Sequence, residues 1–244
     1  MKAAPWLLAQ PGELVTGQTV ELDPVEGRHA GGSLRLKAGR EVVLTDGTGN
    51  VASGVLSSLR RGRVEVAVAS VTQVPAPTSG LTLAMGVLAG AAMDLVLQKA
   101  VELGVESFVP VCCERSQSGL KRATARADHW TRIARQALKQ CHRAWAMDVA
   151  PAVSLADLLV GIGPDRGVVA HPAGGGFGSL DVTPDCVLLV GPEGGFTHEE
   201  DTIIDKARWR RLCLGPHVLR AETAAIAGSA VVLARVGAES GLHS

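Results

Sequence analysis

The chain has 244 residues, of which 46% are hydrophobic and 20% charged, with 24 Lys and Arg against 24 Asp and Glu. This composition excludes a disordered or fibrous protein, and the length favours two globular domains. Residues 2–6 lack the apolar run of a signal peptide and the longest apolar stretch, residues 81–93, is too short to cross a membrane, so we expect a soluble, cytoplasmic protein.

The first third of the chain is predicted to form an antiparallel β domain. Apolar and polar residues alternate in short segments at residues 14–15, 20–22, 41–44, 51–59 and 64–68, and a turn is expected at residues 46–50. We expect these strands to form a barrel. Residues 73–80 contain two prolines, a serine and a glycine, a composition typical of a linker. The predicted first domain therefore covers residues 1–73.

Residues 80–244 are predicted to form an α/β domain. Strands are expected at residues 81–88, 105–111, 167–170, 186–190 and 211–214, and helices at residues 91–103, 127–145, 198–208 and 221–236. Strands that alternate with helices predict a mostly parallel sheet covered on both faces. The cysteines are Cys112, Cys113, Cys141, Cys186 and Cys213. They form no CxxC pair, so we expect mostly buried, unreactive thiols and no metal site.

The strongest local signal is a glycine-rich turn, residues 191–195, directly after a predicted strand. Thr197 and Glu200 follow it with the spacing of a capping box, which opens the next helix. Ligands of open α/β sheets bind beyond the carboxyl ends of the strands, where glycines let a ligand lie against the backbone. The turn is neither a dinucleotide fingerprint nor a P-loop. A cofactor site is favoured, and a tight turn that needs positive φ angles is the alternative.

A second polar turn follows the predicted strand at residues 211–214. It leads to Arg220 and Glu222 at the start of an Ala-rich helix. A carboxylate in the first helical turn is favoured by the helix dipole by about 0.3–1 kcal/mol, whereas a cation there is unfavourable. Arg220 therefore predicts an anionic or polar partner. His171, after the predicted strand at residues 167–170, is expected at the same edge of the sheet, with a purely structural role as the alternative.

The predicted helix at residues 127–145 is amphipathic and basic. One apolar stripe is expected to face the sheet, and a separate basic stripe is expected to face outward; it consists of Arg132, Arg135, Lys139 and Arg143. Residues 115–143 carry eight Lys or Arg against one acid, and residues 181–205 carry seven acids and no base. This asymmetry allows a polyanion on one face, although a basic stripe is equally often a solvated surface. Four Trp, three Phe and no Tyr argue against an RRM-type stacking sheet.

The combined motifs resemble the SPOUT methyltransferases, and in particular the ribosomal RNA small subunit methyltransferase E family, over nearly the whole chain. The motifs are residues 29–31 with 34–35, 98–105, 114–116, 130–143, 191–195 and 214–224. The resemblance implies a PUA-like RNA-binding barrel at residues 1–73 and an α/β trefoil-knot methyltransferase domain at residues 80–244. It also implies a homodimer that uses S-adenosylmethionine, without a metal, to methylate N3 of a uridine in 16S rRNA of the small ribosomal subunit.

The resemblance also implies the residues of each site. The expected cofactor-binding residues are His171, Val190, Gly191, Pro192, Glu193, Gly194, Gly195, Leu214, Gly215, Val218, Leu219, Arg220 and Thr223. The expected catalytic residues are Arg220, which would stabilise charge on the uracil, and Glu222 or Glu193 as proton acceptor or cofactor contact. The expected RNA contacts are Arg35, Arg115, Arg132, Arg135, Lys139 and Arg143.

The chain departs from the family pattern at three places. Residues 88–94 contain no Lys or Arg where the family usually has a basic loop, His217 and Ala221 stand in the motif before the last helix, and Gly32-Ser33 precede Leu34-Arg35. These changes concern RNA contacts more than the cofactor site. Two alternatives therefore stay open: a non-catalytic RNA-binding or ribosome-assembly factor with the same fold, and a SPOUT methyltransferase with another RNA target.

Overall fold

The computed structural model describes residues 4–60, 63–77, 80–176, 178 and 182–239. Contacts between Cα atoms divide the chain into two compact units. The first unit consists of Met1–Pro77 together with Arg135–Ala146, and the second of Thr78–Ala134 and Met147–Ser244. The linker expected at residues 73–80 spans the first division. No sequence pattern predicted that a segment from the middle of the chain would belong to the first unit.

The first unit contains a five-stranded sheet. Its strands are β1 (Trp6–Leu8), β2 (Thr19–Glu21), β3 (Glu41–Thr45), β4 (Asn50–Arg60) and β5 (Arg63–Gln73). Their order is β1-β3-β4-β5-β2, with β1 parallel to β3 and the other pairs antiparallel. Within the described residues β1 does not pair with β2, so the expected barrel is not closed. The strand expected at residues 14–15 is wrong, since these residues lie in a loop.

The predicted turn at residues 46–50 is built around the buried carboxylate of Asp46. Its Oδ1 accepts hydrogen bonds from the backbone N–H groups of Thr48 at 2.8 Å and Asn50 at 3.3 Å, and its Oδ2 accepts one from Asn50 Nδ2 at 2.8 Å. Burial raises the pKa of Asp46, but the hydrogen bonds from Asn50 and Thr48 together lower it by more than burial raises it. The pKa of Asp46 therefore lies below its ordinary value. The ionised form of Asp46 therefore stabilises this turn.

A buried ion pair joins helix α1 (Pro24–Arg28) to helix α4 (Ala127–Cys141) within the first unit. Asp23 caps α1 by accepting from the N–H groups of Val25 and Glu26. The Glu26 side chain is fully buried and lies 2.7 Å from Nζ of Lys139, whose own side chain is 9% exposed. The expectation that Lys139 faces solvent is therefore wrong, because its charge is needed to pair Glu26.

Residues 135–146, around the end of α4, also form hydrogen bonds with the amino-terminal part of the first unit. Arg135 Nη2 donates to the carbonyl of Ala9 at 3.3 Å, and Trp145 Nε1 donates to the carbonyls of Val74 and Pro75. α4 ends at Cys141, earlier than predicted, because His142 adopts a left-handed backbone conformation with φ of 58°. The last part of the apolar stripe of α4 thus packs in the first unit instead of on the parallel sheet.

The second unit contains a parallel sheet. Its strands are β6 (Thr82–Gly86), β7 (Ser107–Cys112), β8 (Asp148–Val149), β9 (Val153–Ser154), β10 (Gly167–Gly175), β11 (Val187–Val190) and β12 (Arg210–Leu212). Their order is β12-β10-β11-β6-β7-β8, with β9 also on β7, and every pair is parallel. The predicted α/β architecture is confirmed.

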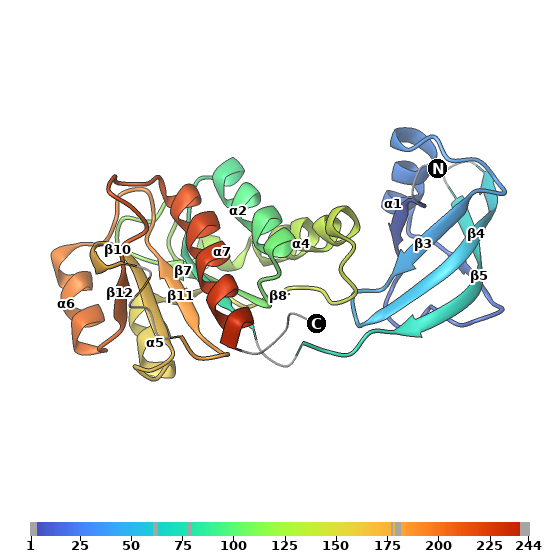
Figure 1. The fold of residues 1–244 in the computed structure, drawn as a ribbon. Helices are drawn as coiled ribbons and strands as arrows, with labels where there is room; N and C mark the ends of the chain where they lie inside the picture. Colours follow the sequence, from blue (N-terminus) through green and yellow to red (C-terminus); the bar gives the residue numbers. More distant parts are fainter. Residues whose placement is uncertain (1–3, 61–62, 78–79, 177, 179–181, 240–244) are drawn as a thin grey trace. The chain divides into compact units, whose positions relative to one another are not determined.

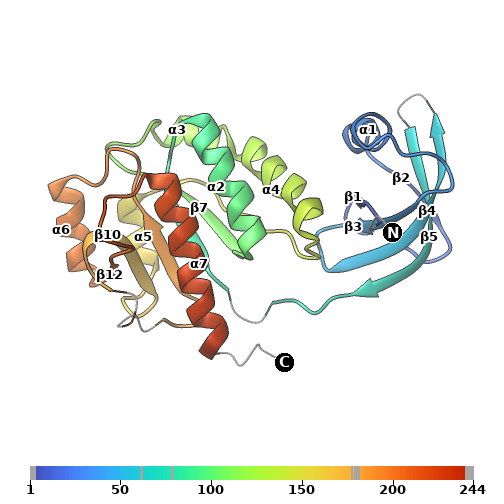
Figure 2. The same ribbon diagram turned by 45° about the horizontal axis from the view of Figure 1, so that its top comes forward.

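Helices cover both faces of this sheet (Figures 1 and 2). They are α2 (Gly90–Leu103), α3 (Leu120–Thr124), the first part of α4, α5 (Leu155–Gly161), α6 (His198–Lys206) and α7 (Ala221–Glu239). α5 and α6 pack on one face around Val169, Val187 and Leu189, while α7 lies beside α2 on the other. Within the described part of the chain no helix combines the length and apolar character needed to span a bilayer.

Local signals explain the ends of the long helices. Gly104 follows α2 in the left-handed conformation with φ of 98°, as expected for a glycine that ends a helix. Thr197 and Glu200 form the predicted capping box at the start of α6. The short elements α3, α5, β8 and β9 were not predicted, because segments of two to seven residues carry too little periodicity.

Candidate functional site

The two predicted turns line one cavity at the carboxyl ends of β10, β11 and β12. Its volume is about 730 Å³. It is lined by Ala92, Ala170, His171, Pro172, Val190, Gly191, Pro192, Glu193, Gly194, Gly195, Phe196, Asp201, Leu212, Cys213, Leu214, Gly215, His217, Val218, Leu219, Arg220, Ala221, Glu222 and Ala224. All of these residues belong to the second unit. Segments that are about 20 residues apart in sequence therefore form a single site.

The cavity collects all but one of the residues expected to hold a cofactor. Thr223 is the exception, because its side chain is exposed and it does not line the cavity. Its neighbours Glu222 and Ala224 do line it, so the helix turns Thr223 outward. Sequence reasoning missed Phe196, Asp201 and Cys213, among others, since no local pattern marks them as pocket residues.

The glycine-rich turn packs directly against the end of β6. A Cβ atom added at Gly86 would lie 2.4 Å from the backbone nitrogen of Pro192, so a side chain at position 86 would displace the turn. Gly195 has a φ of 66°, the left-handed conformation that glycine adopts without strain. The turn therefore contains a residue with positive φ, and it also forms part of the cavity wall.

Arg115 fastens the glycine-rich turn from outside the cavity. Its Nη1 donates to the carbonyl of Gly194 at 3.0 Å and to the carbonyl of Phe196 at 3.2 Å. The neighbouring N–H of Glu114 donates to Oε1 of Glu200 at 2.8 Å. The segment after β7 is thus tied to the turn after β11. Arg115, which was expected to contact RNA, thus donates hydrogen bonds to the cavity wall.

Carboxylates from three segments border the cavity. Asp201 lies 3.5 Å from Nε2 of His171 and 3.3 Å from Nη2 of Arg211. Nδ1 of His171 accepts a hydrogen bond from the N–H of Ala173 at 3.1 Å, which leaves the proton on Nε2 directed toward Asp201. Glu193 accepts from the N–H of Ala89 through Oε1 at 3.1 Å. The cavity wall is therefore polar and acidic at Asp201, Glu193 and Glu222.

Arg220 and Glu222 lie at the entrance to α7. Nη1 of Arg220 is 4.0 Å from Oε1 of Glu222, and the two side chains are 87% and 21% exposed. This weak ion pair leaves the guanidinium of Arg220 able to reorient toward a bound partner. The carboxylate of Glu222 is more buried and lies in the first turn of the helix, where the dipole favours a negative charge.

The residues expected to bind RNA differ in exposure and in ion pairing. Arg35 and Arg132 are exposed, whereas Arg135 and Arg143 are half-buried and Lys139 is paired with Glu26. Arg35 has a left-handed backbone with φ of 50°. The basic stripe of α4 is therefore not a single outward-facing surface. Among the described residues, no group of three His, Cys, Asp or Glu side chains is arranged to hold a metal ion.

Two family models match the chain. The model described as the RNA methyltransferase domain matches residues 75–233, and the model described as the RNA methyltransferase PUA domain matches residues 22–69. The first of these covers the parallel sheet and every residue that lines the cavity. The second covers most of the five-stranded sheet.

Solved structures and a protein relative agree with these matches. A Legionella pneumophila protein solved with the bound cofactor SAM is 31% identical with a TM-score of 0.89, over 96% of this chain and 98% of that chain. Ribosomal RNA small subunit methyltransferase E of Neisseria gonorrhoeae, bound to S-adenosyl methionine, is 28% identical with a TM-score of 0.82, over 98% of both chains. The protein of the same name from Synechocystis sp. is 27% identical over 242 residues, which cover 95% of this chain and 77% of that protein.

Proposed function

Because the chain belongs to the RNA methyltransferase family that includes the ribosomal RNA small subunit methyltransferase E proteins, we propose that it methylates N3 of a specific uridine in 16S rRNA with S-adenosylmethionine as methyl donor. The observation that carries this proposal is the single cavity between the turns at residues 191–195 and 214–220. A metal-free transfer fits this site, since the methyl donor is already activated.

The residues of the cavity fit S-adenosylmethionine in size and charge. The volume of about 730 Å³ lies within the range of about 300–1,000 Å³ typical of small-molecule sites. When bound, the cofactor supplies a methyl group attached to a cationic sulfonium. Carboxylates at Glu193, Asp201 and Glu222 complement positive charge, and the backbone groups at Gly191, Gly194, Leu214, Val218 and Leu219 are available to hold the adenine and methionine parts.

The chain's own residues then have to position the base and move one proton. Uracil N3 carries a hydrogen that must leave before the nitrogen can be methylated. Arg220, exposed at the cavity mouth, would stabilise the negative charge that develops on the carbonyl oxygens beside N3. Glu222 would accept the N3 proton through its carboxylate, with Glu193 as the second candidate. The remainder of the rate enhancement comes from holding N3 in line with the methyl group.

Three finer properties belong to the same proposal. A trefoil knot is supported by the path of the chain, which leaves edge strand β12 and returns beside the glycine-rich turn to reach α7. A homodimer is supported by Val218, which is 84% exposed on the rim of the cavity and would be covered by a second copy. A PUA-like RNA-binding role for residues 1–73 and a cytoplasmic location follow from the rRNA substrate.

Two measurements test the proposal. Calorimetric titration should detect S-adenosylmethionine binding to the wild-type protein, and Arg220→Ala should lose methyl transfer to unmodified 16S rRNA even at a saturating cofactor concentration. Mass spectrometry of 16S rRNA fragments from cells with and without the gene should locate one uridine that loses a methyl group. Cofactor binding without any such difference would point to another RNA target, and absence of cofactor binding would leave a non-catalytic RNA-binding factor.

A further inference from the structure

We propose that a basic surface at the corner between α3 and α4 holds the sugar–phosphate backbone of the RNA next to the target base. The surface, termed the α3–α4 corner, consists of Lys121, Arg122, Arg126 and Arg132. The inference rests on the proposed function, because it names the part of the second unit that the same RNA would contact. It differs from the sequence-based expectation, which placed the contacts at Arg35, at Arg115 and along the basic stripe of Arg132, Arg135, Lys139 and Arg143.

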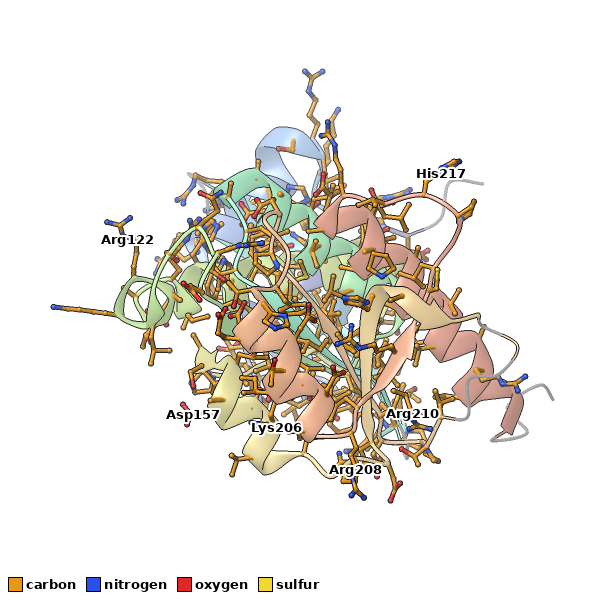
Figure 3. All side chains as sticks on the ribbon, turned by 90° about the vertical axis from the view of Figure 1, so that its left-hand side faces the viewer. Arg122, Asp157, Lys206, Arg208, Arg210 and His217 are labelled. Carbon is orange, nitrogen blue, oxygen red and sulfur yellow. The ribbon has the colours of Figure 1, made fainter. Side chains whose placement is uncertain are left out.

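The α3–α4 corner is positively charged and accessible. Lys121, Arg122 and Arg132 are exposed and Arg126 is half-buried, while Asp128 is the single acid within residues 120–132. Figure 3 shows Arg122 extending from α3 away from the body of the protein. Four cations against one carboxylate make a surface that a phosphate chain can neutralise with release of its counterions.

Two of the cations are held in place by neighbouring side chains. The guanidinium carbon of Arg126 lies 5.9 Å from the centre of the Trp130 ring, a ring that is 1% exposed. Arg132 Nη2 donates to Nδ1 of His129 at 2.9 Å, and His129 Nε2 in turn lies 2.9 Å from Oδ1 of Asp94 on α2. Cations that are already ordered lose little conformational entropy when a phosphate binds.

The corner is continuous with the mouth of the cavity. Arg126 Nη2 lies 3.5 Å from the place that a Cβ atom would take at Gly90, the first residue of α2. The preceding residue, Ala89, donates its N–H to Glu193, which lines the cavity, and Ala92 lines the cavity itself. A nucleotide chain whose base enters the cavity can therefore pass over the start of α2 to Arg126.

Charge directs the RNA along this side. The cavity wall carries the carboxylates of Glu193, Asp201 and Glu222, which repel phosphates but tolerate a neutral base. Further along α4, the charge of Lys139 is paired with the buried carboxylate of Glu26, so it is not available to a phosphate. The corner thus offers a cationic surface near the cavity mouth in addition to Arg220, which the proposed mechanism assigns to the base.

A pair of matched double variants tests this inference on the full-length protein. K121E/R122E reverses two charges of the corner, and K206E/R208E reverses one lysine and one arginine charge at the end of α6 and just beyond it. Figure 3 places Lys206 and Arg208 at the opposite end of the unit from His217, which lines the cavity. The probe is unmodified 16S rRNA transcribed in vitro, and its affinity is measured between 50 and 200 mM KCl, in the range where salt dependence reports phosphate contacts.

We expect K121E/R122E to make the slope of the log of the RNA association constant against log[salt] less steep by about 1.4, since each single-stranded phosphate contact contributes about 0.7 to its magnitude. The same two contacts correspond to an affinity loss of about 25-fold at 0.1 M salt. K206E/R208E should keep the wild-type slope. Both double variants should bind S-adenosylmethionine with wild-type affinity, because none of the four residues lines the cavity.

Equal losses in the two double variants would mean a nonspecific charge effect and would overturn the inference, as would wild-type affinity in K121E/R122E. If K121E/R122E does not fold, K121Q/R122Q removes the same contacts without introducing negative charge and serves in its place. A wild-type protein that binds neither S-adenosylmethionine nor 16S rRNA refutes the proposed function instead. A wild-type protein that methylates while K121E/R122E behaves normally refutes only the role of the corner.

Discussion

Replacement of Arg115 by alanine should weaken cofactor binding although Arg115 does not line the cavity. The side chain donates two hydrogen bonds, at 3.0 and 3.2 Å, to carbonyls of the turn that forms the cavity wall. For an exposed side chain we assign about 1 kcal/mol to each, so the ordered form of the turn loses about 2 kcal/mol. A cofactor that has to restore this order binds about 10- to 30-fold more weakly, at about 1.4 kcal/mol per factor of ten.

The assay is calorimetric titration with S-adenosylmethionine. Arg115→Lys keeps the charge but lacks the planar guanidinium that donates to both carbonyls. We therefore expect a dissociation constant between those of the wild type and Arg115→Ala. Arg122→Ala is the matched control, because it removes an exposed arginine from the neighbouring α3 and should leave the dissociation constant within about twofold of wild type, the scatter expected of a neutral surface change.

The competing explanation is that Arg115 contacts RNA and supports nothing in the cavity wall. In that case Arg115→Ala would bind S-adenosylmethionine like the wild type and bind 16S rRNA about fivefold more weakly at 0.1 M salt, the loss of one phosphate contact. This result would refute the reasoning from the two hydrogen bonds. Loss of affinity for both ligands would mean that the turn also orders the RNA site.

Three more predictions concern single side chains. Lys139→Met should lower the free energy of unfolding by about 3–5 kcal/mol, measured by urea denaturation, because Glu26 is left buried without its partner. Asp46→Asn should destabilise the protein above pH 4 and progressively less at lower pH: the folded pKa lies below 3.8, so the contribution of ionised Asp46 is present above that value and is lost as the pH falls through the folded pKa. Alkylation of Cys213, which lines the cavity, should slow about tenfold at a cofactor concentration of ten times Kd, since only the unliganded fraction reacts.

Controls separate these predictions from general damage. The variant with both Glu26→Gln and Lys139→Met should recover part of the stability lost in Lys139→Met, because the buried charge is gone. An Asp46→Asn deficit that stays constant from pH 7 to pH 3 would contradict the proposed titration. Cys213→Ser identifies the alkylated site by mass spectrometry. Cys113 and Cys186 should stay unmodified, because burial raises the pKa of each thiol, to about 12 and about 11.

The sequence predicts those parts of the molecule whose signals are local. The apolar run before Gly191 and the capping box of Thr197 and Glu200 are contiguous, so the strand, the turn and helix α6 follow directly from them. That the turns lie beside one another follows from the rule for open sheets, once both follow parallel strands. The cavity was therefore predictable in place, though not in every lining residue.

Long-range pairing explains what the sequence could not predict. Periodicity identifies an apolar face on α4, but it does not say what that face contacts, so the assignment of Arg135–Ala146 to the first unit was missed. The role of Lys139 depends on Glu26, a residue 113 positions away. In the same way Asp201 reaches the cavity only because α6 turns it back toward His171.

The inclusion of Arg135–Ala146 in the first unit constrains how the chain matures. During synthesis the amino-terminal strands leave the ribosome first, yet Glu26 has no counter-charge and Val74 and Pro75 lack the indole donor of Trp145 until residues 139 and 145 have emerged. The early segment should therefore wait, incompletely folded and open to chaperones, while the first strands of the parallel sheet are being made. Proteolytic cleavage within residues 74–80 would leave the early segment held only by non-covalent contacts with residues 135–146, such as the ion pair between Glu26 and Lys139.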